Sequence, residues 1–156
     1  MSKVLLAIGG AAIGLLSAPY LKKLFRKNVF VSYRYNGERA MRRLLKAWAK
    51  NTNFKKFDFS DCSADISIPS DDEDVIRDEI SKRIQRADVL LVLIGADTHK
   101  GDWVNWEIAT AKSFGIPIIA VKRHPSLKSP SELLSCGTNW VNGFKFDSIR
   151  SALKKV

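Results

Sequence analysis

Residues 89–121 constrain the fold of this 156-residue chain more than any other segment. An apolar run at residues 89–94 (VLLVLI) and a second at 117–121 (PIIAV) flank a polar loop and a segment of helical period that runs from Trp103 to about Gly115. Neither run alternates apolar with polar residues, so both faces of each strand are expected to be buried, as in a parallel sheet. The segment therefore predicts a strand–loop–helix–strand unit, and such sheets bind ligands at the carboxyl ends of their strands.

Predicted strands and helices alternate along the rest of the chain. A capping box formed by Ser70 and Glu73 predicts the start of one helix. The pattern β-α-β-α-β-α-β-(β)-α predicts an α/β fold, a flavodoxin-like three-layer sandwich with a mostly parallel sheet. Outside the central unit, strands are expected at residues 28–33, 57–59 and 144–146, and helices from residue 38, up to residue 87 and after Asp147.

The helix expected from residue 38 is amphipathic. Its apolar residues Met41, Leu44, Leu45 and Trp48 follow the i, i+3, i+4, i+7 spacing that places them on one face. The basic residues of the opposite face, most simply a solvated face, are Arg39, Arg42, Arg43, Lys46 and Lys50.

The N-terminal segment predicts a single-pass membrane helix. Residues 4–21 contain no charged residue, and as a helix they would span roughly 27 Å, close to the hydrocarbon thickness of a bilayer. Basic residues follow at once, which places the C-terminal domain in the cytoplasm by the positive-inside rule. A GxxxG motif at residues 10–14 would let two such helices approach closely. The expected organisation is a membrane helix with its basic juxtamembrane segment at 1–27, in the inner or cell membrane, and one domain at 28–156.

Two other interpretations of this segment remain open. It could be a cleaved signal peptide, although Pro19 is a poor start for a mature chain and the basic cluster lies on the wrong side. It could also be a helix that packs on the domain or on a neighbouring chain.

Charge and cysteine content exclude several classes of protein. The net charge is +10, but the five basic residues within 1–27 are accompanied by no acid, so half of the excess belongs to that segment. The remaining surplus does not predict a specific nucleic-acid partner. Cys62 and Cys136 have no ligand-like spacing to each other or to His99 and His124, so no metal site is expected. A P-loop, a dinucleotide GxGxxG, a phosphoacceptor acid pair and a nucleophile elbow are all absent from the sequence.

Glu107 is the strongest candidate for a catalytic residue. On a helical wheel it lies beside Trp103, at the border of the core-facing stripe, so it should be partly desolvated next to an aromatic ring. Such a carboxylate can hold ribose hydroxyls and stabilise a cationic sugar. The alternative is an ordinary ion pair with Lys112 or Lys100.

Three segments together resemble the Toll/interleukin-1 receptor (TIR) domain. They are residues 28–33 (NVFVSY), 89–94 and 103–108 (WVNWEI), and the resemblance extends over about residues 28–123. It is closest to the bacterial TIR-like branch of the Thoeris antiphage system. In that branch a Trp-Val-x-aromatic-Glu-Ile segment follows a strand that ends in Leu-Ile-Gly, as residues 93–95 do here.

The resemblance implies an activity and assigns site residues. Many bacterial and plant TIR domains cleave the nicotinamide–ribose bond of NAD, so NAD is expected as substrate, without a cofactor, and ADP-ribose or a cyclic isomer as product. By position, Glu107 would be the catalytic residue, Tyr33, Arg34 and Asp61 would line the pocket, and Trp103 would wall it. Self-association into TIR oligomers and a downstream effector that reads a nucleotide signal in prokaryotic antiphage defence are also implied. The alternative is a non-catalytic TIR module that acts by assembly with a partner.

Overall fold

A five-stranded parallel sheet forms the centre of the molecule. The computed structural model describes residues 7–8, 11–12, 26–51, 59–63 and 68–156. In these residues the strand order is β4-β3-β5-β6-β7 and every neighbouring pair is parallel, which is the flavodoxin order 2-1-3-4-5 counted within the sheet. The expected flavodoxin-like α/β fold is confirmed. The strands are β3 (Lys27–Ser32), β4 (Phe59–Asp61), β5 (Val89–Ile94), β6 (Ile118–Lys122) and β7 (Asn139–Asn142).

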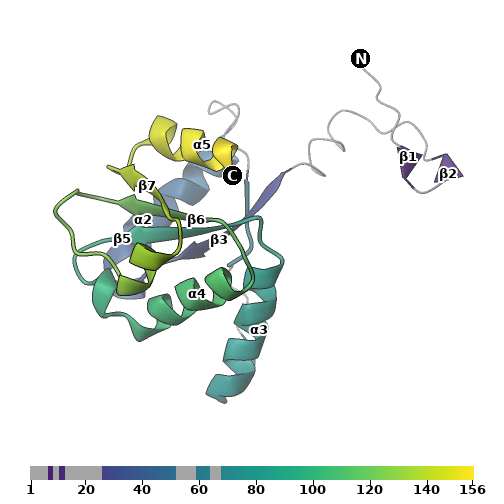
Figure 1. Ribbon diagram of the computed structural model, residues 1–156, viewed down its shortest axis with the longest axis horizontal. Coiled ribbons are helices and arrows are strands. Elements are labelled where there is room, and N and C mark those ends of the chain that lie inside the picture. The colour runs from purple at the N-terminus through teal and green to yellow at the C-terminus, as the bar shows by residue number, and fades with distance from the viewer. Residues whose placement is uncertain (1–6, 9–10, 13–25, 52–58, 64–67) are drawn as a thin grey trace.

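Helices cover both faces of the sheet and make it the middle of three layers (Figure 1). One core lies under α2 (Tyr35–Lys50) and α5 (Phe146–Lys155), where Leu45 and Ile149 pack with Leu91. The other lies under α3 (Glu73–Gln85) and α4 (Asp102–Ser113), where Ile84 and Ile108 pack with Leu90. Successive residues of β5 thus enter opposite cores, which explains its unbroken apolar sequence.

The helix boundaries follow from local hydrogen bonds. The expected cap at Ser70 is displaced by two residues, because the Asp72 side chain accepts the Asp74 N–H (2.9 Å) and is the N-cap of α3. The Ser70 hydroxyl oxygen instead accepts the backbone N–H of Asp72 (3.1 Å). The helix α4 ends at Ser113, close to the expected Gly115, which follows the C-cap residue Phe114 with a φ of 68° that suits a residue without Cβ.

The last strand differs from the prediction. It is β7 at Asn139–Asn142, and the strand expected at residues 144–146 is wrong because Phe146 is already the first residue of α5. The alternating Phe-Lys-Phe pattern has another cause: the rings of Phe144 and Phe146 lie 5.3 and 5.6 Å from that of Trp48. Of the strand expected at residues 57–59, only Phe59 lies among the described residues, and it begins β4.

The N-terminal prediction is corrected. Ala7–Ile8 and Ala11–Ala12 form two short antiparallel strands, β1 and β2, so these four residues are not helical; the rest of residues 4–21 lies outside the described residues. Among the residues that the structure does describe, no helix combines the length and the apolar character that a bilayer span requires. The expected single-pass membrane localisation is therefore wrong. Arg26 and Lys27, assigned to a juxtamembrane cluster, donate to backbone carbonyls of the domain, those of Phe59 and Leu153.

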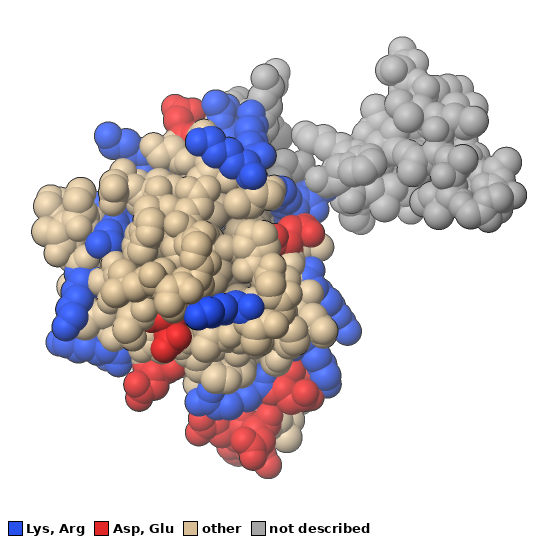
Figure 2. All heavy atoms as spheres, viewed as in Figure 1, with Lys and Arg blue, Asp and Glu red and all other residues tan. Residues whose placement is uncertain are grey.

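Acidic side chains gather over α3, while basic ones are scattered over the rest of the visible face (Figure 2). Three of the four acids of α3 are paired along the helix: Glu73 with Arg77, Asp78 with Lys82 and Glu79 with Arg83. This mixed surface does not form the continuous basic stripe typical of a nucleic-acid interface.

Candidate functional site

Glu107 lies at the carboxyl end of the sheet, where α4 packs against β3. Its side chain is buried, with 7% of the residue exposed. Ser32, the last residue of β3, donates its hydroxyl to the Glu107 carboxylate, and the Trp103 side chain one helical turn earlier is also hydrogen-bonded to it. Two residues 75 positions apart in the sequence are thereby joined at one point of the sheet edge.

Burial raises the pKa of Glu107 to about 7, against an ordinary value of 4.5. The hydrogen bonds from Ser32 and Trp103 act in the opposite direction, because they stabilise the ionised form, but their effect on the pKa is smaller than that of desolvation. A carboxyl group with a pKa near neutrality, in a cavity, is a common property of catalytic acids and bases.

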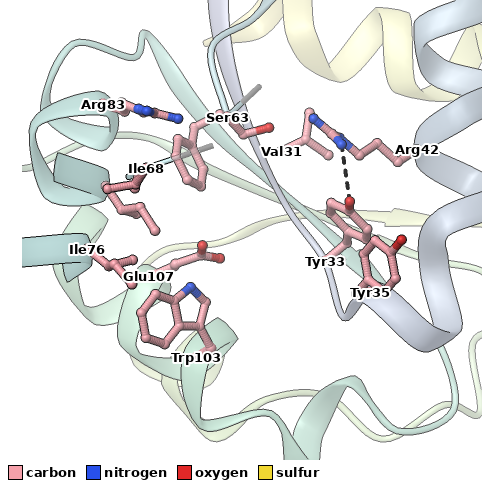
Figure 3. A pocket seen from close by; sticks show the side chains of 12 residues that line it. Val31, Tyr33, Tyr35, Arg42, Ser63, Ile68, Ile76, Arg83, Trp103 and Glu107 are labelled. Carbon is pink, nitrogen blue, oxygen red and sulfur yellow. Dashed lines mark hydrogen bonds between the residues drawn. The ribbon is translucent and has the colours of Figure 1, made fainter. Parts of the chain in front are cut away.

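The Glu107 pocket, about 370 Å³ in volume, opens beside this carboxylate. Trp103 and Glu107 lie on one side of it, and Tyr33, Tyr35 and Arg42 lie on the other (Figure 3). Its volume falls in the lower part of the range for small-molecule sites. The remaining described residues of its lining are Phe30, Val31, Ser63, Ile68, Ile76, Ile80 and Arg83.

The wall opposite Glu107 is fixed by a buried ion pair. Arg42 donates to the Tyr33 hydroxyl and to the Asp61 carboxylate, both at 3.1 Å, and its guanidinium lies 5.1 Å from the centre of the Tyr33 ring. The side chains of Arg42 and Asp61 are 9% and 7% exposed. The prediction that Arg42 belongs to a solvated face of α2 is therefore wrong.

Trp103 is held from outside the pocket by Arg77 of α3. The Arg77 guanidinium lies 4.6 Å from the centre of the Trp103 ring and 4.7 Å from that of Trp106, and the two rings are 5.4 Å apart. A cation over an aromatic face is attracted by the ring quadrupole. Arg77 thus limits the movement of the indole that contacts Glu107.

The structure brings together most of the residues predicted for the site. Tyr33, Trp103 and Glu107 line one pocket, and Asp61 stands behind Arg42 in its wall. Arg34 lies elsewhere: it lines a neighbouring pocket of about 240 Å³, and its guanidinium donates to the Asp97 carbonyl at 3.0 Å. The roles assigned to these residues stay predictions.

Sequence reasoning missed Ser32, the hydroxyl partner of Glu107, and four polar residues of the pocket lining, Tyr35, Arg42, Ser63 and Arg83. Arg42 could have been found, because it stands three residues before Leu45 and next to Met41, at the edge of the apolar stripe. Nothing local distinguishes Ser32. Among the described residues, no group of three or more His, Cys, Asp or Glu side chains is placed to hold a metal ion.

The fold and the site define a class: an α/β protein with a flavodoxin-like sheet and a buried carboxylate at the carboxyl ends of its strands. Residues 30–128 match the profile of the family described as Thoeris protein ThsB, TIR-like domain, and the chain belongs to that family.

Two solved structures share the fold at low sequence identity. One is a conserved protein from Enterococcus faecalis V583, with a TM-score of 0.56 and 15% identity over 83% of this chain and 98% of that one. The other is the CMP N-glycosidase BcmB from Clostridium botulinum, with a TM-score of 0.56 and 14% identity over the same shares of the two chains. No curated protein matches this chain.

Proposed function

We propose that this TIR-like protein is an NAD nucleosidase that cleaves the nicotinamide–ribose bond in prokaryotic antiphage signalling. The observation that carries the proposal is Glu107, a buried carboxyl group with a pKa raised to about 7 that borders a pocket walled by aromatic rings. The TIR-like Thoeris family of the chain supports the signalling context.

The proposed reaction needs a carboxylate but no proton donor to the leaving group. Glu107 accepts hydrogen bonds from the ribose hydroxyls and stabilises the oxocarbenium ion that develops as the C1′–N bond breaks. The bonding electron pair moves to the pyridinium nitrogen, so nicotinamide leaves as a neutral molecule. Water then adds to C1′ and loses a proton, giving ADP-ribose, or a nucleophile of the same ADP-ribosyl group adds and gives a cyclic isomer.

The rest of the pocket has complementary tasks in this proposal. Trp103 and Tyr33 present ring faces and edges that would pack on a flat base and exclude water from the cation. Arg42, paired with Asp61, and Arg83, paired with Glu79, also line the pocket, and their guanidinium N–H groups are donors of the kind that bind the phosphate groups of a dinucleotide.

The structural similarity to BcmB, whose name states that it acts on CMP, suggests a second substrate class, pyrimidine nucleotides. In this alternative the leaving group is a neutral pyrimidine, which must be protonated to leave, so a protonated Glu107 would act as the acid. The two substrates therefore predict opposite pH profiles: NAD cleavage rises as pH passes through about 7, whereas CMP cleavage falls.

The test measures how fast the protein, at high concentration, consumes NAD and how fast it consumes CMP, and identifies the products by mass spectrometry. Glu107→Gln removes the charge and keeps the shape, and Glu132→Gln is the matched control, because Glu132 lies in the 3-10 helix at Ser131–Ser135 and does not line the Glu107 pocket. Loss of NAD that requires Glu107 but not Glu132 supports the proposal. Activity that survives Glu107→Gln overturns it.

The rival function is a TIR module that signals only by assembly with a partner. It predicts that Glu107→Gln signals normally, whereas surface substitutions on the helices abolish signalling. Self-association belongs to both functions, so measurement of the oligomeric state alone does not separate them.

A further inference from the structure

A second carboxylate, Glu38, is buried near the same edge of the sheet. It lies in the first turn of α2 and is 2% exposed. Its Oε2 accepts the backbone N–H of Arg34 at 3.1 Å, and the Thr98 side chain is hydrogen-bonded to it. Burial raises the pKa of Glu38, while these hydrogen bonds and the guanidinium groups of Arg34 and Arg123 act to lower it. Glu38 does not line the Glu107 pocket.

Thr98 connects Glu38 to the start of α4. It is fully buried, its hydroxyl oxygen accepts the N–H of Gly95 at 2.8 Å, and its carbonyl accepts the N–H of Gly101 at 3.1 Å. Gly101 is the N-cap of α4, two residues before Trp103. The bond between Glu38 and Thr98 therefore joins the turn after β3 to the loop that leads from β5 into α4.

A second link runs parallel to the first. The Arg34 guanidinium donates to the Asp97 carbonyl at 3.0 Å, from the same turn to the same loop. Arg34 is the N-cap of α2, and its N–H is the group that Glu38 accepts. The two links share their ends and would have to break together for the loops to separate.

Gly95 permits this arrangement because it has no Cβ. A Cβ at this position would lie 1.9 Å from Oε1 of Glu38, far inside any contact distance. The backbone at the end of β5 thus lies directly against the Glu38 carboxyl group, and the glycine is required for close approach.

Each of the two joined loops adjoins an element that carries residues of the Glu107 site. Ser32, Tyr33 and Tyr35 belong to the end of β3 and the start of α2, whereas Trp103 and Glu107 belong to α4. We propose that Glu38 is a positioning residue of this site: through Thr98 it fixes the start of α4 against the end of β3, and so holds Glu107 on the Ser32 hydroxyl and Trp103 over the pocket. This role rests on the proposed function of the pocket.

Removal of Glu38 should therefore act on Glu107 at a distance. With the link gone, the start of α4 moves, the Ser32–Glu107 bond opens and water reaches the carboxylate. Hydration removes the cause that raises the pKa of Glu107, so that pKa should fall from about 7 toward its ordinary 4.5. A residue that only stabilised α2 would not have this effect.

The experiment compares Glu38→Ala, Glu38→Gln and Thr98→Val with the parent. Two quantities are measured: the pKa of Glu107, from the carboxyl ¹³C shift of protein labelled in glutamate side chains, and kcat and KM for NAD. Glu38→Ala and Thr98→Val should each lower the pKa by at least one unit and kcat at least tenfold. Glu38→Gln keeps an oxygen for the Arg34 N–H and should recover part of both. Thr98→Val removes the hydroxyl with little change in side-chain volume. If Glu38→Ala does not fold, Thr98→Val still tests the link.

The matched control is Ile149→Ala, which removes a fully buried side chain from α5, on the face of the sheet opposite α4 and Glu107. It should lower the melting temperature and leave the Glu107 pKa and kcat unchanged. An unchanged Glu107 pKa in both Glu38→Ala and Thr98→Val overturns the positioning role, even where NAD is cleaved. A lowered pKa in a protein that cleaves no NAD supports the positioning role and refutes the proposed function, so the two failures are distinct.

Discussion

Glu107 and Glu38 are both buried glutamates at the same edge of one sheet, yet their surroundings differ. Glu107 borders a pocket of about 370 Å³, and its hydrogen-bond partners among the described residues are the side chains of Ser32 and Trp103. Glu38 accepts a backbone N–H and lies so close to Gly95 that a single methyl group would not fit. Burial raises the pKa of both.

The difference shows that burial alone does not identify a catalytic carboxylate. A group that must meet a substrate needs adjacent space and partners that can adjust, whereas a group that braces two loops needs neither. We therefore expect substitutions at the two positions to separate activity from stability.

Glu107→Gln should have the largest effect of all. Loss of the charge that stabilises the oxocarbenium ion should lower kcat for NAD by about 10³-fold, the scale of removing one preorganised electrostatic partner. The measurement is the rate of nicotinamide release at pH 8. A loss below about tenfold would place Glu107 outside the chemistry and remove the contrast with Glu38.

The same variant should be more stable than the parent. Because the folded pKa is about 7 and the ordinary value is 4.5, the folded state holds a proton that the unfolded state releases between these pH values, and stability falls as pH rises through that window. Glutamine escapes this loss, so the free energy of unfolding at pH 8 should rise by about 2 kcal/mol. Urea unfolding at pH 4 and pH 8 checks the sign, since no gain is expected at pH 4.

Arg42→Met tests the buried ion pair that fixes the wall of the Glu107 pocket. It removes the guanidinium from the buried Asp61 carboxylate, which keeps the hydrogen bonds from Ser63 and a more distant Lys46 at 4.0 Å, and should cost about 3 kcal/mol of stability. Arg43→Met is the control, because Arg43 is exposed on the same helix and should cost less than about 0.5 kcal/mol. Equal midpoints of urea unfolding for the two variants would contradict the buried ion pair.

Gly95→Ala tests the closeness of Glu38. The added methyl group must displace a buried carboxyl group, so the free energy of unfolding should fall by about 2 kcal/mol. Gly37→Ala is the matched control: it lies in α2, and a Cβ there would meet no atom within 4 Å, so its effect should be neutral or slightly stabilising. Similar unfolding curves for the two variants would show that the Glu38 site is loosely packed.

Ser32→Ala should have the smallest effect, and only in one pH range. The Ser32 hydroxyl stabilises the ionised form of Glu107, so its loss should raise that pKa further, by about one unit for a hydrogen bond of ordinary strength. At pH 7 NAD cleavage should fall severalfold, and at pH 9 it should match the parent. The measurement is kcat/KM against pH; an unmoved acid limb would mean that Ser32 does not act on the charged form.

The central strands of the fold could be predicted from the sequence because their unbroken apolar runs have one cause, burial on both faces of the sheet. The expected strand at residues 89–94 coincides with β5, since burial on both faces leaves no place for a polar residue. β7 was missed because it is an edge strand with a single buried residue, Val141, and so lacks a pattern. The cap of α3 was misplaced because Ser70, Asp72 and Glu73 all offer capping chemistry and only geometry selects among them.

The site was predictable only where one helix carries it. Trp103 and Glu107 are one turn apart, so their proximity follows from helical spacing. The partners of Glu107 across the sheet depend on the pairing of distant strands, and no local pattern contains that information. This is why Ser32 was missed and why Arg34 was expected in a pocket that it does not line.

The hydrogen bond between Ser32 and Glu107 also has a consequence for how the chain folds during its synthesis on the ribosome. The two residues are 75 positions apart, so the chain between them must be synthesised before the bond can form, and closing so long a loop is a late and entropically costly event. A nascent chain that has completed β3 and α2 has no Glu107 to meet, so the proposed active site forms only after α4 has left the ribosome and docked. Conversely, local opening of α4 would dismantle the Glu107 pocket while the sheet remains intact.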